Sequence, residues 1–367
     1  MPGRIWGFLV SPIWIGFLLN AAIESSRVFI PLLTVELGGS SFDVGLVGAA
    51  SGLAYFVTAL VIGPQADSLG RLRFVRVGLA GSALAFLGQL LARDVASLLA
   101  VRTAVGLALG ITTGSLVVLA YEDRGGVGKF SSMSSLGWIF GATAAALLKE
   151  CELLFLFSFV VCTVAFLISL KLEEWNKLRL LHAPRSFPVF WRNRAVYLPF
   201  FLRHLGASAV WIIFPLYLQE LGADRFWIGM VGTANYAGQV VLMTLVERYA
   251  GTGLFRLGLC LSGAVFLLYT ALSHFMQVLP VHVMLSAAWS TLYIGALVLL
   301  LRSGEERATA TGILVANMNL CFAAGPFLGG VLSSLWGYHA PMYAAAALSF
   351  AGLFWAPRRD GRRGAGA

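Results

Sequence analysis

Long apolar segments constrain the fold of this chain more than any other feature. A helix needs about 20 consecutive, mostly apolar residues to cross a membrane, and polar or Gly-Pro interruptions cut the sequence into twelve such segments. Because only helices satisfy the backbone of these segments in lipid, we predict an all-α integral membrane protein with twelve transmembrane helices. The expected spans are 5–35, 42–63, 74–92, 95–121, 129–148, 152–170, 195–220, 227–247, 254–274, 279–301, 308–335 and 340–356.

The distribution of basic residues predicts the orientation of the chain. Of the 26 Lys and Arg residues, 20 lie in the termini or in loops on the same side as the termini, and three lie in the opposite loops. Because basic loops stay in the cytoplasm, we expect both termini there, in a plasma or inner membrane. The net charge of +9 then needs no nucleic-acid partner, since basic loops and tails also suit the anionic lipids of the inner leaflet.

No sequence pattern points to a metal, a cofactor or an enzyme. The four cysteines and five histidines are scattered, without metal-ligand spacing. The glycine-rich run from Arg124 to Lys129 lacks both the glycine spacing of a phosphate loop and the Ser or Thr that follows its Gly-Lys. We therefore expect no cofactor, no metal site and no ATPase or other enzyme activity.

The two halves of the sequence repeat each other at an offset of 184 residues. Ten of twenty positions around the first outside loop of each half are identical, from Pro31 and Pro215 to Ala50 and Ala234. Glycines and prolines at fixed offsets indicate the same turn built twice. The repeat predicts a six-helix half over 1–170, a cytoplasmic linker over 171–194, a second half over 195–357 and a basic tail over 358–367, which is the parallel-repeat plan of many transporters.

The polar segment between the second and third spans carries a specific pattern. Residues 63–73 read Gly-Pro-Gln-Ala-Asp-Ser-Leu-Gly-Arg-Leu-Arg, which resembles the loop signature of major facilitator superfamily transporters. Gly63, Ala66, Asp67, Gly70 and Arg71 match that signature, whereas positions 65, 68 and 72 depart from it. Within that superfamily the sequence pattern is most similar to drug/proton antiporter-like members. The resemblance implies a monomeric secondary transporter with two pseudo-symmetric halves.

The resemblance also implies that this loop latches the cytoplasmic ends of the two halves when the transporter opens outward. Gly63 and Gly70 would permit a tight reversal, and Arg71 and Arg73 would face cytoplasmic water. The simpler alternative is that the arginines only set the topology. The expected gate residues, including acidic partners after the fourth span, are Gly63, Asp67, Gly70, Arg71, Arg73, Glu122 and Asp123.

Ionisable residues inside the spans are the candidates for proton coupling. Asn20, Glu24 and Arg27 share one face of the first span, and such groups usually face a cavity or a partner. Glu24 could pair with Arg27 or act as a protonatable cavity acid. Arg102 lies in Arg-Thr-Ala-Val-Gly, which resembles the Arg-x-x-Gln-Gly of the family's fourth span. The resemblance implies that Arg102 influences a cavity acid, and its depth puts Glu24 within reach.

Polar and aromatic residues of the second half are the candidates for substrate contacts, although any one aromatic could equally be a packing residue. They are Arg203, His204, Trp211, Asn235, Tyr236, Gln239, Trp289 and Tyr293. Glycines at four-residue spacing, Gly106 and Gly110, should let another helix approach closely. Gly325, Pro326 and Gly329 suggest a hinge in the eleventh span.

Two substrate classes fit the sequence. Efflux of amphipathic or cationic organic molecules, driven by protons at Glu24, is favoured by the family loop and by Arg102. Transport of an organic anion is favoured by three arginines against one acid inside the spans, and by the fifth span, which lacks the proline motif of drug antiporters. A third alternative is a non-transporting sensor or lipid-handling protein on the same scaffold.

Overall fold

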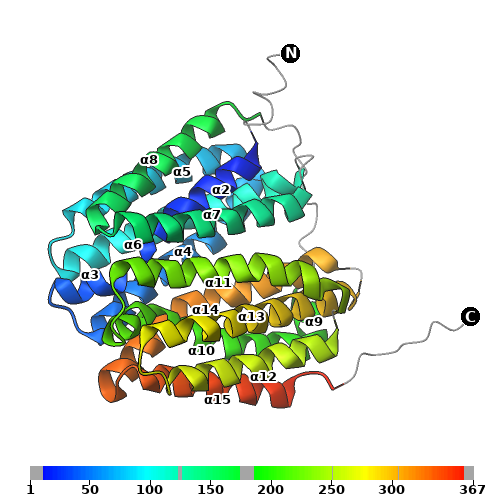
Figure 1. Ribbon diagram of the computed structural model, residues 1–367. Helices are drawn as coiled ribbons and strands as arrows, with labels where there is room; N and C mark the ends of the chain where they lie inside the picture. The colour runs from blue at the N-terminus through cyan, green and yellow to red at the C-terminus, as the bar shows by residue number, and fades with distance from the viewer. Residues whose placement is uncertain (1–10, 123–125, 174–185, 250, 305, 359–367) are drawn as a thin grey trace, which may run out of the picture.

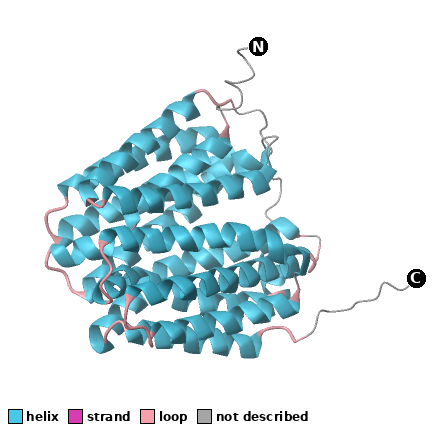
Figure 2. Ribbon diagram, in the orientation of Figure 1, coloured by secondary structure: helices cyan, strands magenta, loops and turns pink. Residues whose placement is uncertain are grey.

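The computed structural model describes residues 11–122, 126–173, 186–249, 251–304 and 306–358, in which every regular element is helical (Figure 2). The first half contains α2 (Pro12–Arg27), α3 (Ile30–Glu36), α4 (Ser41–Leu69), α5 (Arg71–Gly88), α6 (Val95–Glu122), α7 (Gly126–Leu148) and α8 (Cys151–Leu170). After the short α9 (Ser186–Arg192) come α10 (Arg194–Glu220), α11 (Arg225–Val246), α12 (Thr252–Tyr269), α13 (Val278–Leu301), α14 (Arg307–Trp336) and α15 (His339–Trp355). Because α2 and α3 together form one span, the described ranges confirm the twelve-helix architecture.

Most of these helices could cross a membrane alone. Nine helical stretches of the described chain are long and apolar enough to do so, and α7, α11 and α15 are not among them. In α11 the reason is its polar content, since it carries Asn235 and Gln239 near its middle. Polar residues of this kind stay in a membrane when they face other helices rather than lipid.

The first span is broken, although the sequence predicts one continuous helix over 5–35. Helix α2 ends at Arg27, and α3 begins at Ile30 with a proline, Pro31, in its first turn. Proline lacks the backbone N–H and clashes with the carbonyl four residues earlier, so a helix tends to break before it. The break lies directly after Arg27. The matching Pro215 lies inside α10, which continues through it.

The second span is longer than the sequence predicts. Helix α4 runs on to Leu69 rather than ending at 63, and the chain reverses at Gly70 alone, whose φ of 102° suits glycine. Gly63 therefore lies inside a helix, and a Cβ placed on it would meet nothing within 4 Å. The expectation that Gly63 helps to form the turn is wrong, because the helix satisfies its own backbone through this segment.

Helix packing repeats between the two halves. In the first half α2 packs against α7 and α8, α4 packs against α6, and α5 packs against α6 and α8. The second half has the equivalent neighbours, since α10 packs against α14 and α15, α11 against α13, and α12 against α13 and α15. Figure 1 shows the halves as two layers of helices that diverge toward the end where α9 lies.

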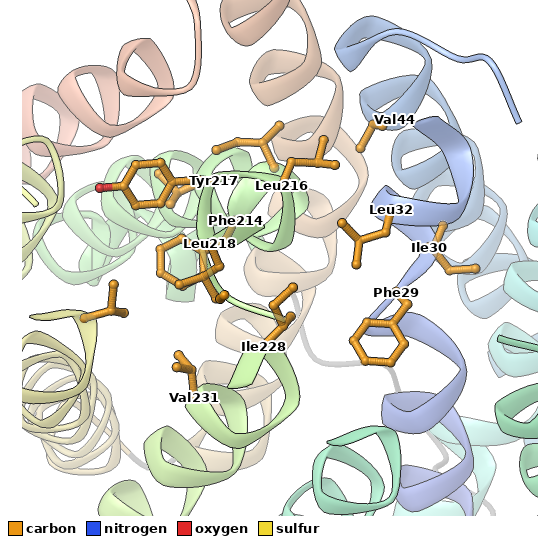
Figure 3. Close-up of a cluster of buried hydrophobic side chains, with 14 of the residues drawn as sticks. Phe29, Ile30, Leu32, Val44, Phe214, Leu216, Tyr217, Leu218, Ile228 and Val231 are labelled. Atoms are coloured by element: carbon orange, nitrogen blue, oxygen red, sulfur yellow. The ribbon is translucent and has the colours of Figure 1, made fainter. Parts of the chain in front are cut away.

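The opposite end of the molecule is closed by a shared apolar cluster (Figure 3). Phe29, Leu32 and Val44 of the first half are buried in one cluster with Phe214 and Ile228 of the second. The turns at this end also repeat, because Gly38 and Gly222, 184 residues apart, have φ of 86° and 88°. Burial of apolar side chains from both halves stabilises the contact between them at this end.

Candidate substrate and coupling site

The first contact between the halves is formed by α4 and α14, and glycines bring the two backbones close together in it. We call it the glycine seam, and its residues are Gly45, Gly48, Gly52, Phe322, Pro326 and Gly330. A Cβ on Gly45 would lie 2.5 Å from the Cα of Gly330, and one on Gly52 would lie 2.3 Å from the carbonyl oxygen of Phe322. Small residues let helix backbones approach this closely, so the two backbones pack directly against each other.

The second contact is formed by α7 and α11, and it contains polar side chains. We call it the polar seam, and its residues are Trp138, Thr143, Thr233 and Tyr236. The hydroxyl oxygens of Thr143 and Thr233 lie 3.2 Å apart, and the ring centroids of Trp138 and Tyr236 lie 5.8 Å apart. The hydrogen-bonding groups of the polar seam therefore lie between the halves, at the depth of the ionisable residues of α2.

Glu24 is the centre of a hydrogen-bonded network that joins the halves. Its carboxylate accepts from Arg27 at 2.5 Å and from the hydroxyl of Tyr236 at 2.8 Å, and Arg27 also contacts the Tyr236 hydroxyl at 3.3 Å. The Glu24 side chain is 5% exposed, whereas that of Arg27 is 47% exposed. Because Arg27 reaches across to α11, its exposed part faces the space between the halves. Both sequence-based roles of Glu24, ion pair and cavity acid, suit this arrangement.

Arg102 does not contact Glu24, contrary to the reach expected from depth alone. Its side chain is buried and donates to the Gln89 side-chain oxygen at 3.1 Å, while its Nε has no hydrogen-bond partner. Depth along two helices does not fix the direction in which each side chain points, and Arg102 points toward η1 (Gln89–Leu91). Arg27 is near enough for the two positive charges to repel each other. Arg102 therefore remains a buried cation whose contact in the described structure is a neutral amide.

Arg203 is a second buried cation with neutral surroundings. Its side chain is among the largest fully buried ones, and its Nε donates to the Ser262 hydroxyl at 2.9 Å. The guanidinium lies over the rings of Trp289 and Phe266, at 5.2 Å and 5.6 Å from their centroids. It does not snorkel to the membrane surface, because aromatic faces attract a cation.

His204, the neighbour of Arg203, is enclosed by aromatic rings. Its ring centroid lies 5.6 Å from that of Phe200, 5.3 Å from that of Trp289 and 5.1 Å from that of Phe322. Both ring nitrogens are buried and have no hydrogen-bond partner in the described structure. We call His204 and these three rings the aromatic box. Trp289 in turn stacks on Tyr293 at 5.3 Å.

The remaining candidates lie apart from these groups. Asn20 donates to the carbonyl of Gly16 within its own helix at 2.8 Å. Gln239 donates to the side chain of Asn235 one turn earlier, and the Asn235 amide nitrogen itself lacks a partner. Trp211 packs edge-on against Phe214 at 5.3 Å within the apolar cluster of the closed end. The structure therefore does not bring all the predicted substrate residues together.

The gate residues are only partly described. The side chains of Asp67 and Glu122, and all of Asp123, lie outside the described part of the chain. Arg73 is exposed, as expected, but Arg71 is buried at 4% exposure, so it does not face water as the sequence suggested. Because Arg71 begins α5 directly after the Gly70 reversal, its side chain lies against neighbouring helices.

The glycines at four-residue spacing serve helix packing. A Cβ on Gly106 would lie 2.2 Å from the carbonyl oxygen of Ser51, and one on Gly110 would lie 2.6 Å from that of Tyr55, so both pack against α4. In α14, Gly325 and Gly329 pack in the same way against α10 at Ser208 and Ala209, and Pro326 lies against Gly48. Within the described residues, α14 is one helix through Pro326.

Several residues of the site were missed by the sequence analysis. Gln89 contacts Arg102, Phe322 contacts His204, and Thr143 and Thr233 contact each other in the polar seam. No pattern in the sequence singles out these four residues. The glycine seam did carry a signal, because Gly45 and Gly48 belong to the internal repeat. Among the described residues no group of His, Cys, Asp or Glu side chains could hold a metal ion.

Comparison with known proteins decides the family. The family model of the Major Facilitator Superfamily matches residues 13–202 and 196–366, which is nearly the whole chain. The chain belongs to the major facilitator superfamily. Its drug/proton antiporter-like subtype stays a prediction, and a comparison with curated protein sequences finds no match.

Solved structures of the superfamily share the fold at low sequence identity. The nucleoside transporter NupG superposes with a TM-score of 0.78 at 13% identity, covering 94% of this chain and 96% of that one. The human organic anion transporter MFSD10 (TETRAN) superposes with a TM-score of 0.69 at 19% identity, covering 95% of this chain and 98% of that one. At these identities the similarity shows the superfamily fold. The substrate has to be inferred from the residues of the site.

Proposed function

We propose that this superfamily member is a secondary transporter of a small organic anion, coupled to protons and working by alternating access. The observation that supports it is the pairing of charges inside the spans. Glu24 already pairs with Arg27, whereas Arg102 and Arg203 are buried and contact only neutral groups in the described structure. A cation would find its only intramembrane carboxylate occupied, while an anion would meet two uncompensated positive charges.

Proton coupling is proposed for Glu24, because it is the only acidic residue well inside a span and its contacts join the halves. In its ionised form the carboxylate accepts hydrogen bonds from Arg27 and Tyr236. Protonation removes its charge and weakens both contacts, since hydrogen bonds to charged groups are the stronger ones. A proton on Glu24 would therefore weaken the contact between α2 and α11 and favour separation of the halves.

The membrane arrangement follows from the basic loops. With both termini in the cytoplasm, the halves 1–170 and 195–357 would be joined by the cytoplasmic linker 171–194, and the end closed by the apolar cluster would face outward. The arrangement would then be an inward-facing one, and the monomer would be the working unit. The loop 63–73 would latch the halves in the opposite state.

A four-probe thermal-shift experiment on the purified full-length protein tests the substrate charge. Benzoate and cyclohexanecarboxylate are compared with benzylamine and cyclohexylmethylamine, in which a CH2–NH3+ group replaces the carboxylate on the same ring. Because a ligand that binds the folded state raises the melting temperature, we expect the acids to stabilise the protein and the amines to leave it unchanged. Stabilisation by the amines alone would overturn the proposal in favour of cation efflux.

The proposed latch has its own test. Asp67→Asn removes the carboxylate of the loop while keeping its size, and we expect it to shift the balance between outward-facing and inward-facing states. Spin labels on the cytoplasmic ends of both halves measure that balance. An unchanged distance distribution would leave the basic residues as topology signals only.

A further inference from the structure

The aromatic box encloses a buried polar side chain that has no hydrogen-bond partner in the described structure. His204 is 4% exposed and neither ring nitrogen has a partner in the described structure. A buried polar group without a hydrogen bond destabilises the fold, so such groups are rare unless they serve another purpose. The other buried histidine of this half, His282, is satisfied by the Tyr269 hydroxyl at 2.8 Å, which shows that the fold can supply a partner.

The box lies at the face where the halves meet. Phe322, one of its walls, is 38% exposed, and its backbone carbonyl lies against Gly52 of the first half. Trp289, another wall, is only partly buried and continues into the stacked ring of Tyr293. The box therefore lies beside the glycine seam, where the two halves meet.

The charge around the box is positive. The Arg203 guanidinium lies 5.2 Å from the Trp289 centroid and contacts no carboxylate in the described structure. The acidic residues of 195–357 all lie at or beyond the ends of the expected spans; they are Glu220, Asp224, Glu247, Glu305 and Glu306. Within a low-dielectric membrane, an uncompensated cation favours the entry of a negative charge.

From this geometry we infer that the aromatic box binds a planar aromatic anion, with its ring stacked on the exposed Phe322 beside the edge of Trp289 and its carboxylate bonded to His204. Aromatic rings attract one another in offset-stacked and edge-on arrangements, and the histidine nitrogens would gain the partner that they lack. Arg203 supplies the positive field without touching the ligand. The inference rests on the proposed function and specifies the ring class of the anion.

The same four probes separate the ring from the charge. We expect benzoate to bind about tenfold more tightly than cyclohexanecarboxylate, which corresponds to about 1.4 kcal/mol, because the saturated ring cannot stack flat. Equal binding of the two acids, or no binding of benzoate, overturns the inference that the aromatic box binds an aromatic ring. Binding of cyclohexanecarboxylate would still support the proposed anionic substrate. Binding of the amines alone overturns the proposed function.

Two matched variants locate the effect. His204→Leu removes the ring nitrogens that would bond the anion and should weaken benzoate binding about tenfold. His282→Leu removes the satisfied histidine of the same half and should leave benzoate binding intact. If either protein fails to fold, Trp289→Phe, which retains a ring, is compared with Trp289→Leu, which does not; equal benzoate binding by these two also overturns the inference.

Discussion

The two seams occupy equivalent places in the internal repeat but differ in chemistry. Gly45 and Gly330 touch through their backbones in the glycine seam, and the positions 184 residues away, Gly229 and Ala146, touch in the polar seam. Further along, Gly52 meets the backbone of Phe322, whereas its counterpart Tyr236 meets the ring of Trp138. One seam is thus backbone on backbone, while the other holds rings and hydroxyl groups at the same depth.

The difference indicates a division of labour. The glycine seam has no ionisable side chain, so its closeness depends only on shape. The polar seam carries Tyr236, which bonds to the carboxylate of Glu24 in the other half. A change of protonation or of ligand can therefore act on the polar seam directly, and the glycine seam follows because both belong to the same rigid halves.

The largest expected effect comes from filling the glycine seam. In Gly330→Val the new Cβ would lie 2.6 Å from the Cα of Gly45, which is too close for the seam to form. We expect transport into proteoliposomes to fall by more than about tenfold, since overpacking costs about 1–3 kcal/mol. Gly312→Val is the control in the same helix, because its Cβ would meet nothing within 4 Å. Similar losses in both variants would contradict the role of shape in this seam.

The next largest effect is expected at Glu24, whose carboxylate bonds to Tyr236 of the polar seam. Glu24→Gln keeps hydrogen-bonding capacity but cannot exchange a proton, so we expect proton-driven transport to drop about tenfold or more while exchange without a gradient persists. Glu152→Gln changes an exposed acid in the first turn of α8 and serves as the control. Proton-driven uptake or efflux that survives Glu24→Gln would end the coupling proposal.

A smaller effect is expected from removing the Tyr236 hydroxyl of the polar seam. Tyr236→Phe keeps the ring against Trp138 but removes the bonds to Glu24 and Arg27, which are worth about 0.5–1.5 kcal/mol each. Spin-label distances between the halves should show a threefold to tenfold smaller population closed at the α3 end. The double variant with Glu24→Gln should add little to this, because residues in one network are not additive. Additive effects would separate Tyr236 from Glu24.

The smallest effect is expected at the exposed rim of the closed end. Arg225 contacts the carboxylates of Glu36 at 2.5 Å and Glu150 at 3.3 Å, joining the two halves. Exposed pairs contribute about 0.2–1 kcal/mol and are screened by salt, so Arg225→Gln should weaken closure at low salt and not at high salt. Lys149→Gln, which loses a longer 3.6 Å pair with Asp224 and a contact with the ring of Phe226, should have a smaller effect. A salt-independent loss in Arg225→Gln would show that the contact acts through packing.

Much of the architecture could be predicted from the sequence. The twelve spans follow from hydrophobic length, and the turn at Gly38 and Gly222 follows from identical residues at a fixed offset. The Glu24–Arg27 pair also follows, because residues three apart share a helix face. These are local or periodic properties, and local properties are what a sequence records directly.

The partners across helices could not be predicted. Tyr236 meets Glu24 from 212 residues away, and Arg102 turns to Gln89 because helix rotation, not depth, decides which side chains meet. The sequence predicts a turn at Gly63, because a polar segment between two apolar ones suggests a loop. The helix continued instead, since its backbone bonds are satisfied internally and nothing crowds it there.

The single-residue corner at Gly70 has a mechanical consequence. Because only Gly70 separates α4 from α5, there is no slack between the helix that forms the glycine seam and the helix that carries Arg71 and Arg73. Any tilt of α4 against α14 must therefore move the start of α5 as well. A label on the exposed Arg73 position would thus report, from the far end of the molecule, whether the glycine seam is open or closed.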